Sequence, residues 1–430
     1  MNVCSQKVYA QQLDLATPRQ WRDLVPKAIL TEVSRQHGGD QASGKLTAPV
    51  HFWVLVVATL SKGCSSAKDL LSRFQARFGA LWGLPAGNRA WVTPAALSQR
   101  NRGRPVAFWQ TMYQRLREHH FGSGWRRKAW QKQFVALEAL DSSTFRLMAR
   151  LRQVFTPSGS GGAKKGSKNP KGALKIHQVY HVGSELPAEV AIGPAREHDA
   201  KGWKKALQLA RRGVLYLLDR GYCDFKLWWA IEGAWSYFIT PLKSNVAYEH
   251  LRWLNPKRQR DRVKDHLVRF PGMDQGDDFV ILRLVEIRQA DGAWWCYVTN
   301  VMQDQLSPAD VAEIYSLRWR IEIFFRHLKH TLNMGHWFAE SEAGVQAQLY
   351  AGLIGYLLSQ VVLLWASREA RLAPEQFRFT TVVHELAEWL VSQLYQNSLL
   401  DRSVLLDHVC RNAIEKDHRR NSQCFEALPT

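Results

Sequence analysis

Two apolar runs that each end in an aspartate constrain the fold of this chain more than any other feature. The first runs from Phe134 to Asp141, with Ser142–Thr144 predicted as a turn after it, and the second runs from Gly213 to Asp219. A continuous apolar strand is typical of a sheet that is covered on both faces, and ligands of such sheets gather at strand ends. The sequence therefore predicts an α/β domain in which Asp141 and Asp219 each end a strand and lie close together.

Residues 134–241 alternate between strand-like and helix-like segments. The expected strands are Phe134–Asp141, Leu174–Val182, Ala188–Ile192, Val214–Asp219 and Tyr237–Pro241, and the expected helices are Lys201–Arg212 and Phe225–Gly233. This order predicts a ribonuclease-H-like core. The loop Thr156–Gly172 follows the first strand and is rich in Ser, Gly and Lys, so we expect it to bind phosphate rather than to act as a plain linker.

A third acidic residue, Glu322, lies in a helix-like segment that also carries Tyr315, Arg318 and Lys329. At about 100° per residue, these four side chains fall within roughly 60° of one another on one helix face. An adjacent apolar stripe would hold the helix against a core, and it consists of Leu317, Ile321, Phe324, Phe325 and Leu328. A salt-bridged surface is the usual interpretation of such a mixed-charge helix. The two strand-end aspartates favour a functional one.

The spacing Tyr-x2-Arg-x3-Glu-x6-Lys, at Tyr315, Arg318, Glu322 and Lys329, resembles the signature of the insertion-sequence-four family of DDE transposases. The segment that begins at Asp219 reads Asp-Arg-Gly-Tyr and resembles a second motif of that family. The resemblance implies a DNA transposase that binds the ends of its mobile element and works by cut-and-paste cleavage and strand transfer, through a hairpin intermediate. It also implies a homodimer on paired double-stranded ends.

The resemblance implies that three carboxylates carry catalysis and bind metal, namely Asp141, Asp219 and Glu322. Three carboxylates can hold two divalent cations, which stabilise the attacking and leaving oxygens of phosphodiester cleavage. Hard oxygen ligands favour Mg²⁺, with Mn²⁺ as a substitute, over Zn²⁺. The expected DNA contacts are a bidentate phosphate contact by Arg318, a point charge from Lys329, and a phosphate or sugar contact by Tyr315.

Other titratable residues near these motifs have simpler interpretations. Asp199 follows a Gly-Pro turn and precedes a helix-like run, so it is predicted to cap that helix, although it is also a rival for a catalytic role. Asp224 is predicted to begin the next helix. His327 and His330 have no neighbouring Cys or His cluster, so they are expected to be solvated or to face DNA.

A β-rich insertion is predicted at residues 244–306, where the next core helix is delayed. Its two β-like segments, Phe279–Arg288 and Ala293–Thr299, flank an Asp-Gly turn signal, and a basic run spans Lys257–Lys264. Members of the resembled family use an aromatic residue in this place to hold a flipped base, which implies that role for Trp294 or Trp295. Adjacent strand residues point to opposite faces, so we expect one tryptophan in the core and one free for DNA. The sequence leaves the choice open.

The net charge of +20, from 58 Lys and Arg against 38 Asp and Glu, indicates a polyanionic partner such as DNA. Six cysteines without a CxxC pair predict neither a zinc site nor a disulfide framework. The N-terminus has no pattern of a signal peptide, and glutamines interrupt the apolar region around Leu349–Leu358, which predicts a buried helix. We therefore expect a cytoplasmic, nucleoid-associated bacterial protein without a membrane partner.

Three parts are expected along the chain. Residues 1–125 predict a helical N-terminal DNA-binding domain, residues 126–345 the catalytic domain with its insertion at 244–306, and residues 346–430 a helical C-terminal region that supports dimerisation. The predicted helices outside the core are Pro49–Ser61, Ala67–Phe78, one that begins at Thr93-Pro94, one that begins at Ser307 and carries Glu322, Val345–Glu369 and Thr380–Leu394. The basic segment Leu97–Arg104 suits either a major groove or a solvated helix end. The charged C-terminal tail, which includes Arg411, is expected to fray.

Two other functions remain compatible with the sequence. One is a regulator that descends from a transposase and binds DNA without catalysis, which the presence of all three carboxylates disfavours. The other is a structure-specific nuclease of the same fold that lacks strand transfer.

Overall fold

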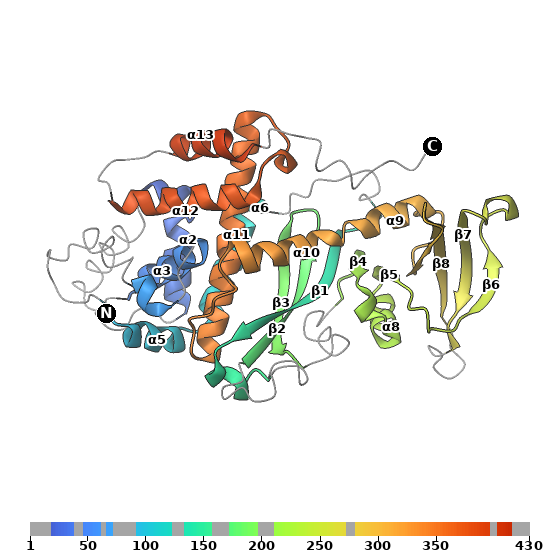
Figure 1. Cartoon of the computed structure of the whole chain (residues 1–430), viewed down its shortest axis with the longest axis horizontal. Coiled ribbons are helices and arrows are strands. Elements are labelled where there is room, and N and C mark those ends of the chain that lie inside the picture. The colour runs from blue at the N-terminus through green and yellow to red at the C-terminus, as the bar shows by residue number, and fades with distance from the viewer. Residues whose placement is uncertain are drawn as a thin grey trace. The chain divides into compact units, whose positions relative to one another are not determined.

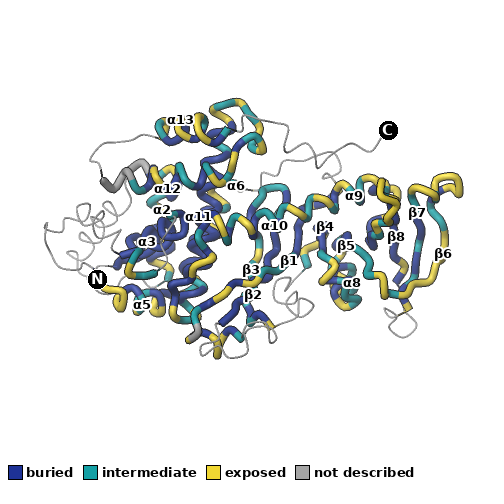
Figure 2. The backbone as a smooth tube through the Cα atoms, viewed as in Figure 1, coloured by how far each residue is buried: buried dark blue, intermediate teal, exposed yellow. Residues whose placement is uncertain are grey.

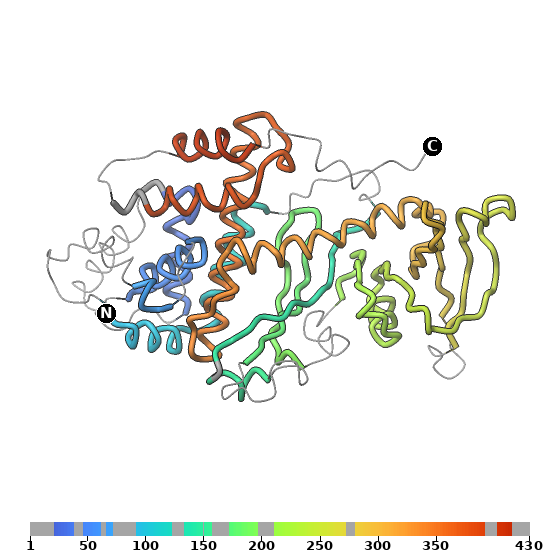
Figure 3. Tube along the Cα trace, in the orientation of Figure 1, coloured from blue at the N-terminus to red at the C-terminus, as the bar shows by residue number. Residues whose placement is uncertain are grey.

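The computed structural model describes residues 19–37, 46–61, 66–71, 92–122, 133–156, 172–196, 210–271, 280–395 and 402–414. The chain divides into two compact units. The sheet unit spans Gly124–Phe325, and the helical unit combines Met1–Ser123 with Arg326–Thr430. Figure 3 shows the described helices of the helical unit in blue where they come from the N-terminal part of the chain and in orange to red where they come from the C-terminal part. Several expectations lie wholly or partly outside the described residues: the phosphate-binding loop from 157 to 171, Asp199, the helix over 201–209, the predicted helix Ala67–Phe78 beyond residue 71, and the charged tail beyond residue 414.

The sheet unit is built on one nine-stranded sheet in the order β3-β2-β1-β4-β5-β9-β8-β7-β6 (Figure 1). The strands are β1 Ala136–Leu147, β2 Gly172–His181, β3 Leu186–Pro194, β4 Val214–Leu218, β5 Tyr237–Pro241, β6 Glu249–Trp253, β7 Val263–Arg269, β8 Ile281–Arg288 and β9 Trp294–Thr299. The pairs β1–β4 and β4–β5 are parallel. The other pairs are antiparallel. All five predicted core strands are therefore confirmed.

Helices pack on both faces of this sheet. The helices of the sheet unit are α8 Phe225–Gly233, α9 Pro308–Ser316 and α10 Trp319–Arg326, with short 3-10 turns η3 Ala149–Gln153, η5 Arg220–Tyr222 and η6 Lys257–Gln259. Trp228 of α8 lies in a buried cluster with Leu140, Leu218 and Phe238. Phe324 of α10 instead contacts Tyr180 of β2, with ring centroids 5.4 Å apart. The apolar character of these strands follows from burial on both sides.

The predicted starts of α8 and α9 are confirmed by their caps. The side chain of Asp224 accepts a hydrogen bond from the backbone of Lys226 at 2.8 Å, at the start of α8. Ser307 and Asp310 form a reciprocal capping box at the start of α9. These local signals are readable in the sequence because a cap involves residues only two or three positions apart.

Two expectations about strands are wrong in detail. Ser142–Thr144 do not form a turn, because β1 continues to Leu147 as the antiparallel partner of β2. The insertion contains β8 and β9 as predicted, but also β6 and β7. The basic run Lys257–Lys264 lies in the connection from β6 to β7 and includes the first two residues of β7. The insertion strands extend the core sheet, because β9 pairs directly with β5.

The helical unit is organised around α11, which packs against α3, α5, α6, α12 and α13. Its helices are α2 Lys27–Gln36, α3 Ala48–Leu60, α5 Pro94–Gly103, α6 Val106–Phe121, α11 Glu342–Ala370, α12 Phe379–Tyr395 and α13 Arg402–Ala413, with short turns η1 Arg19–Asp23, η8 His327–Thr331 and η9 Pro374–Gln376. Every residue of α3 is buried, and Figure 2 shows α3 and most of α11 in the colour of buried residues. The predicted helices around Pro49–Ser61, Val345–Glu369 and Thr380–Leu394 are thus confirmed.

In the part of the chain that the structure describes, α11 is the single helix with the length and apolar composition to cross a bilayer. Of its most apolar stretch, 89% is buried within the structure. A helix that is apolar on all sides is expected at the centre of a helical bundle, which is where α11 lies.

The basic segment Leu97–Arg104 is only partly available to a ligand. Thr93 caps α5 as predicted, and its hydroxyl accepts a hydrogen bond from Ala96 at 3.1 Å. Arg104, however, is buried and its Nε donates to His51 Nδ1 at 3.2 Å. Burial lowers the pKa of His51 to about 3, so this imidazole stays neutral beside the guanidinium. The expectation that Arg104 faces solvent or a DNA groove is wrong.

One C-terminal segment is more ordered than expected. The residues Arg402–Ala413 form α13, and Leu405 and Val409 on this helix are buried. Arg411, which was expected in a fraying tail, pairs with Asp407 one turn earlier at 2.7 Å. The charged composition masked an amphipathic helix.

Candidate active site

Asp141 and Asp219 lie side by side at the end of a parallel ladder. The last paired residues of β1 and β4 are Leu140 and Leu218, and each aspartate follows directly. Asp219 lies directly after the last residue of β4, so the prediction that it marks the end of a strand is confirmed. Asp141 does not end a strand, because its other neighbour β2 continues and pairs Gln178 with it. The prediction that Asp141 ends a strand is therefore wrong, although Asp141 does mark the point where the parallel pairing stops.

Backbone amides hold both aspartates. Asp141 Oδ1 accepts a hydrogen bond from the amide of Ser142 at 2.7 Å. Asp219 caps the short turn η5, and its Oδ2 accepts from the amide of Gly221 at 3.3 Å. In each case one carboxylate oxygen is partly occupied by the chain itself.

The helix that carries the third carboxylate is not continuous. The α-helical hydrogen bonds stop after α9, and the amides of Leu317 and Arg318 bond three residues back, to Ile314 at 3.1 Å and Tyr315 at 3.0 Å. A second change follows α10, where His327–Thr331 form a π turn. A single helical phase from Tyr315 to Lys329 is therefore wrong, because a 3-10 turn and a π turn each change the angle per residue.

The tight turn places the Arg318 side chain among the acidic residues. Its Nη2 lies 2.6 Å from Glu322 Oε1, and its Nη1 lies 3.8 Å from Asp141 Oδ2. The guanidinium also lies over the ring of Tyr315, 5.7 Å from its centroid. Asp219 lies near enough for its charge to influence Asp141, Tyr315 and Arg318. These five residues thus form one cluster.

Burial is the main influence on the titratable groups of the cluster, and the neighbouring carboxylates add to it. Burial raises the pKa of Asp141 to about 7, the amide of Ser142 and the charge of Arg318 oppose that shift, and the charges of Asp219 and Glu322 add to it. Burial likewise raises the pKa of Tyr315 to about 12, so its hydroxyl stays protonated. Three carboxyl groups lie around the guanidinium of Arg318, so the acidic groups outnumber this basic one, which favours the binding of further cations.

The donors of this cluster fit hard divalent cations. All three are carboxylates, which suit Mg²⁺ or Mn²⁺ rather than softer metals. Across the described ranges, no three His, Cys, Asp or Glu side chains are close enough to hold a metal ion together as they stand. The guanidinium of Arg318 lies between the carboxylates of Asp141 and Glu322.

The two tryptophans of the insertion occupy different environments, and neither is in the core. Trp294 is half-buried beneath Lys264, whose Nζ lies 4.2 Å from the ring centroid. Trp295 is 54% exposed. Strand alternation places Trp295 on the same face as Tyr297, whose ring centroid lies 5.0 Å from that of Tyr315. The expectation of one core tryptophan is wrong, but the face of Trp295 is the face of the carboxylate cluster.

Lys329 and the two histidines belong to the helical unit. Lys329 lies in the π turn η8, and its phosphate contact stays a prediction. His327 is not solvated as expected, because its ring packs edge-on against Phe379 at 4.6 Å and its Nδ1 lies 3.2 Å from Thr331 Oγ1. Burial lowers the pKa of His327 to about 4. His330 is exposed, in keeping with the expectation.

Several structurally important residues of the sheet unit were not found from the sequence. Tyr297 is buried against Tyr315, and the alternation Trp295-x-Tyr297 was the signal available for it. Trp319 follows Arg318 directly and is 51% exposed. Arg283 and Asp265 form a fully buried bidentate pair, with bonds of 2.8 and 2.9 Å. No local sequence pattern predicts such a pair between two strands.

The Arg283–Asp265 pair fixes the segment that leads into α9. The Nη1 of Arg283 donates to the carbonyl oxygens of Leu306 at 2.7 Å and Val301 at 3.3 Å. Leu306 directly precedes Ser307, the cap of α9. The insertion thereby anchors the start of the helix pair that carries the Tyr315, Arg318 and Glu322 side chains.

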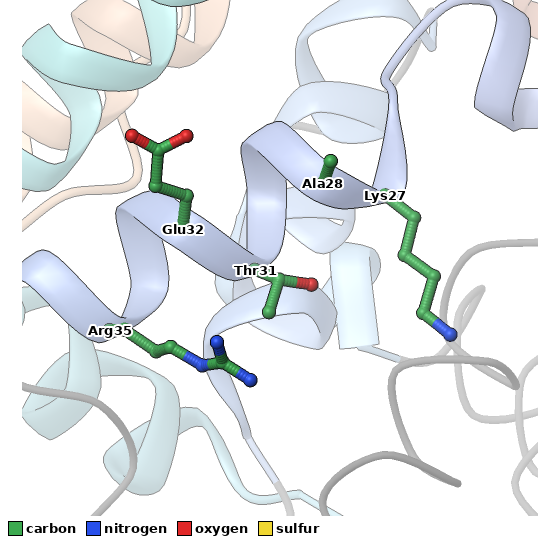
Figure 4. Close-up of a pocket in the computed structure, with 5 residues that line it drawn as sticks. All are labelled: Lys27, Ala28, Thr31, Glu32 and Arg35. Atoms are coloured by element: carbon green, nitrogen blue, oxygen red, sulfur yellow. The ribbon is translucent and has the colours of Figure 1, made fainter.

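A hollow of about 490 Å³ lies elsewhere, on one face of α2 (Figure 4). Its lining residues all come from that helix, namely Lys27, Ala28, Thr31, Glu32 and Arg35. Glu32 is paired with Arg115 of α6 at 2.7 Å. This open hollow contains none of the predicted site residues.

Comparison with known proteins agrees with the motifs. Residues 138–358 match a family model described as "Transposase DDE domain". A protein of Sinorhizobium fredii named as a transposase, y4zB, is 31% identical over 216 residues, which cover 49% of this chain and 58% of that protein. The transposase of insertion sequence element IS4 from Escherichia coli is 24% identical over 43% of each chain. The transposase of element IS231B from Bacillus thuringiensis is 21% identical over 81% of this chain and 79% of its own length.

The chain spans about half the length of the first three curated relatives it matches, from 49% to 58% of each. A cryo-EM structure of the piggyBac transposase synaptic complex with hairpin DNA aligns with a TM-score of 0.43 at 10% identity, covering 97% of this chain and 88% of that one. That similarity is too low to establish a common fold.

Proposed function

Because this chain belongs to the IS4 family of DDE transposases, we propose that it is a DNA transposase. It would bind the ends of its mobile element and would cleave and join DNA strands. The observation that carries the proposal is the convergence of Asp141, Asp219 and Glu322 on one guanidinium beside the β1–β4 ladder. The catalytic and metal-binding roles go to these three carboxylates.

The catalytic core is proposed to be ribonuclease-H-like. The strand order β3-β2-β1-β4-β5, with β1–β4 and β4–β5 parallel and the first two pairs antiparallel, supports this assignment. Helices on both faces of the sheet support it further. The N-terminal helices are proposed to bind DNA and the C-terminal helices to support a homodimer on paired ends, in the bacterial cytoplasm near the nucleoid.

In the reaction, Asp141, Asp219 and Glu322 would hold two Mg²⁺ ions, for which Mn²⁺ can substitute, and the ions would stabilise charge on the attacking and leaving oxygens. Arg318 would bind a phosphate next to the scissile bond through its planar fork. The protonated hydroxyl of Tyr315 would donate to the same phosphate. Lys329 would add a further positive charge along the strand.

The test is replacement of the carboxylates. Asp141→Ala, Asp219→Ala and Glu322→Ala should each abolish cleavage of end-containing DNA, while affinity for the ends stays within about tenfold because Lys and Arg contacts dominate binding. Glu313→Ala is the matched control, since Glu313 is exposed on α9. Cleavage by the Glu322→Ala protein at the rate of the wild type would refute the proposal.

The second strand is proposed to be cut through a DNA hairpin, with Trp295 as the platform for an unpaired base. Stacking of a base on an aromatic ring contributes about 1–3 kcal/mol, and Trp295 is exposed on the face of the carboxylate cluster. Trp295→Ala should leave first-strand nicking nearly intact and reduce hairpin formation, whereas Trp294→Ala, on the opposite face, should change neither. Denaturing gels of end-labelled DNA show the hairpin as a slow band. Its absence from wild-type reactions that still release the element would exclude this route.

An excision assay separates the two alternative functions. A catalytically inactive DNA-binding regulator would bind the ends without cutting them, and a structure-specific nuclease would cut without joining.

A further inference from the structure

The strongest unexplained feature of the molecule is the position of Arg318. Its side chain is only 13% exposed, and it lies between Asp141 and Glu322, which are 18% and 31% exposed. It contacts Glu322 at hydrogen-bond distance but approaches Asp141 only to 3.8 Å. A guanidinium that is proposed to bind DNA phosphate thus lies on the side chains that are proposed to bind metal.

The hydrogen bonds of this guanidinium are incomplete. The Nε of Arg318 is buried and has no hydrogen-bond partner among the described residues. A buried donor without a partner is costly, so this arrangement is not an optimised structural pair. Release of Arg318 would break its one short side-chain bond to a carboxylate, the 2.6 Å bond to Glu322, while Nε has no bond to lose.

Arg318 and divalent cations exclude one another at the carboxylate oxygens, because both are positively charged. One guanidinium partly neutralises three crowded carboxylates, and two divalent cations at the same oxygens would repel it. Arg318 and the metal ions therefore compete for Asp141 and Glu322. Once displaced, the fork of Arg318 is next to the cluster and has no carboxylate to bind.

We propose that Arg318 is the resting cation of the carboxylate cluster and that divalent cations displace it, which frees its fork to bind a DNA phosphate. This inference rests on the proposed function and adds a coupling between its two ligands. Metal binding and end binding then strengthen each other, and by linkage the factor is the same in both directions. The DNA-free protein would hold metal weakly, and the complete site would form only on DNA.

Calcium binding to the full-length protein without DNA tests the competition. In isothermal titration with Ca²⁺, Arg318→Gln should bind about tenfold more tightly than wild type, because the competing charge is gone. Arg318→Lys should bind like wild type. The matched control is Arg320→Gln, since Arg320 pairs with Glu185 at 2.7 Å, away from the carboxylates. If Arg318→Gln is poorly folded by circular dichroism, Arg318→Met serves in its place.

The reciprocal measurement uses a duplex that carries the element end. Addition of Ca²⁺ should raise the affinity of the wild type for this duplex by about tenfold, and the rise should be several-fold smaller in Arg318→Gln. Equal Ca²⁺ affinities for Arg318→Gln and wild type would overturn the displacement while leaving the metal-binding carboxylates in place. Absence of Ca²⁺ binding in every variant, including wild type with DNA, would overturn both this inference and the proposed metal site.

Discussion

Two arginines of the sheet unit show opposite ways of using a buried positive charge. Arg283 in the insertion is fully buried, pairs with one carboxylate through two bonds and donates to two carbonyl oxygens. Arg318 in the carboxylate cluster faces more carboxylates than it can neutralise and leaves its Nε without a partner.

The difference teaches how to separate structure from function in ion pairs. A buried pair whose charges and hydrogen bonds are complete stabilises one arrangement, and removing one partner leaves an uncompensated charge. A cluster with a surplus of one charge can bind further ligands of the opposite charge. Carboxyl groups with shifted pKa values are common at such functional sites. The Arg283–Asp265 pair of the insertion is the complete buried pair, and the cluster around Asp141 is the one with surplus charge.

The largest effect is expected from breaking the complete pair. Arg283→Met should lower the free energy of unfolding by about 3–5 kcal/mol, because it leaves Asp265 buried without its partner. Arg318→Met should cost much less, since its neighbours are partly exposed. Urea denaturation of both proteins measures the difference. Equal losses would contradict the distinction between the two arginines.

A comparably large effect concerns DNA affinity, which is expected to depend on basic residues rather than on the carboxylate cluster. End binding should weaken on the order of a thousandfold between 50 and 200 mM salt, if six or more phosphates are contacted. Reversing two exposed charges of the insertion, Lys257→Glu with Arg258→Glu, should reduce the salt slope by about two. Fluorescence anisotropy at several salt concentrations measures both. A flat salt profile in the wild type would speak against phosphate contacts.

An intermediate effect is expected from pH, because Asp141 is protonated in the folded chain up to a pKa of about 7 but has an ordinary value of 3.8 when unfolded. Between these values the folded state binds the additional proton, so stability falls by about 1 kcal/mol per unit as pH rises, and the fall ends above pH 7. Asp141→Asn removes this pH dependence of the stability. Its stability relative to wild type should rise from pH 5 to 7 and then stay constant, in urea melts with a chelator present. Parallel curves for the two proteins would contradict the raised pKa.

The smallest effect is expected from a change that keeps the charge of Arg318. Arg318→Lys should reduce cleavage by about tenfold, because the bidentate fork is lost while the positive charge remains. The same substitution at Arg320, which pairs with Glu185, should have little effect. Rates from single-turnover cleavage assays compare the two. Full activity of Arg318→Lys would show that charge alone matters at this position.

Local patterns in the sequence predicted much of this molecule. The apolar runs that become β1 and β4, the cap at Asp224 and the capping box at Ser307 all depend on residues a few positions apart, so a short window contains the whole signal. The same holds for the spacing of Arg318 and Glu322, which meet within one turn.

Tertiary structure alone decided the rest. The extension of β1 beyond Asp141 depends on its antiparallel partner β2, and the joining of the insertion to the core sheet depends on β9 pairing with β5. The Arg283–Asp265 pair and the approach of Arg318 to Asp141 join residues that are far apart in the chain. Such contacts form because burial brings distant charges into a space where each must find a partner, and no local period or cap records which partner that is.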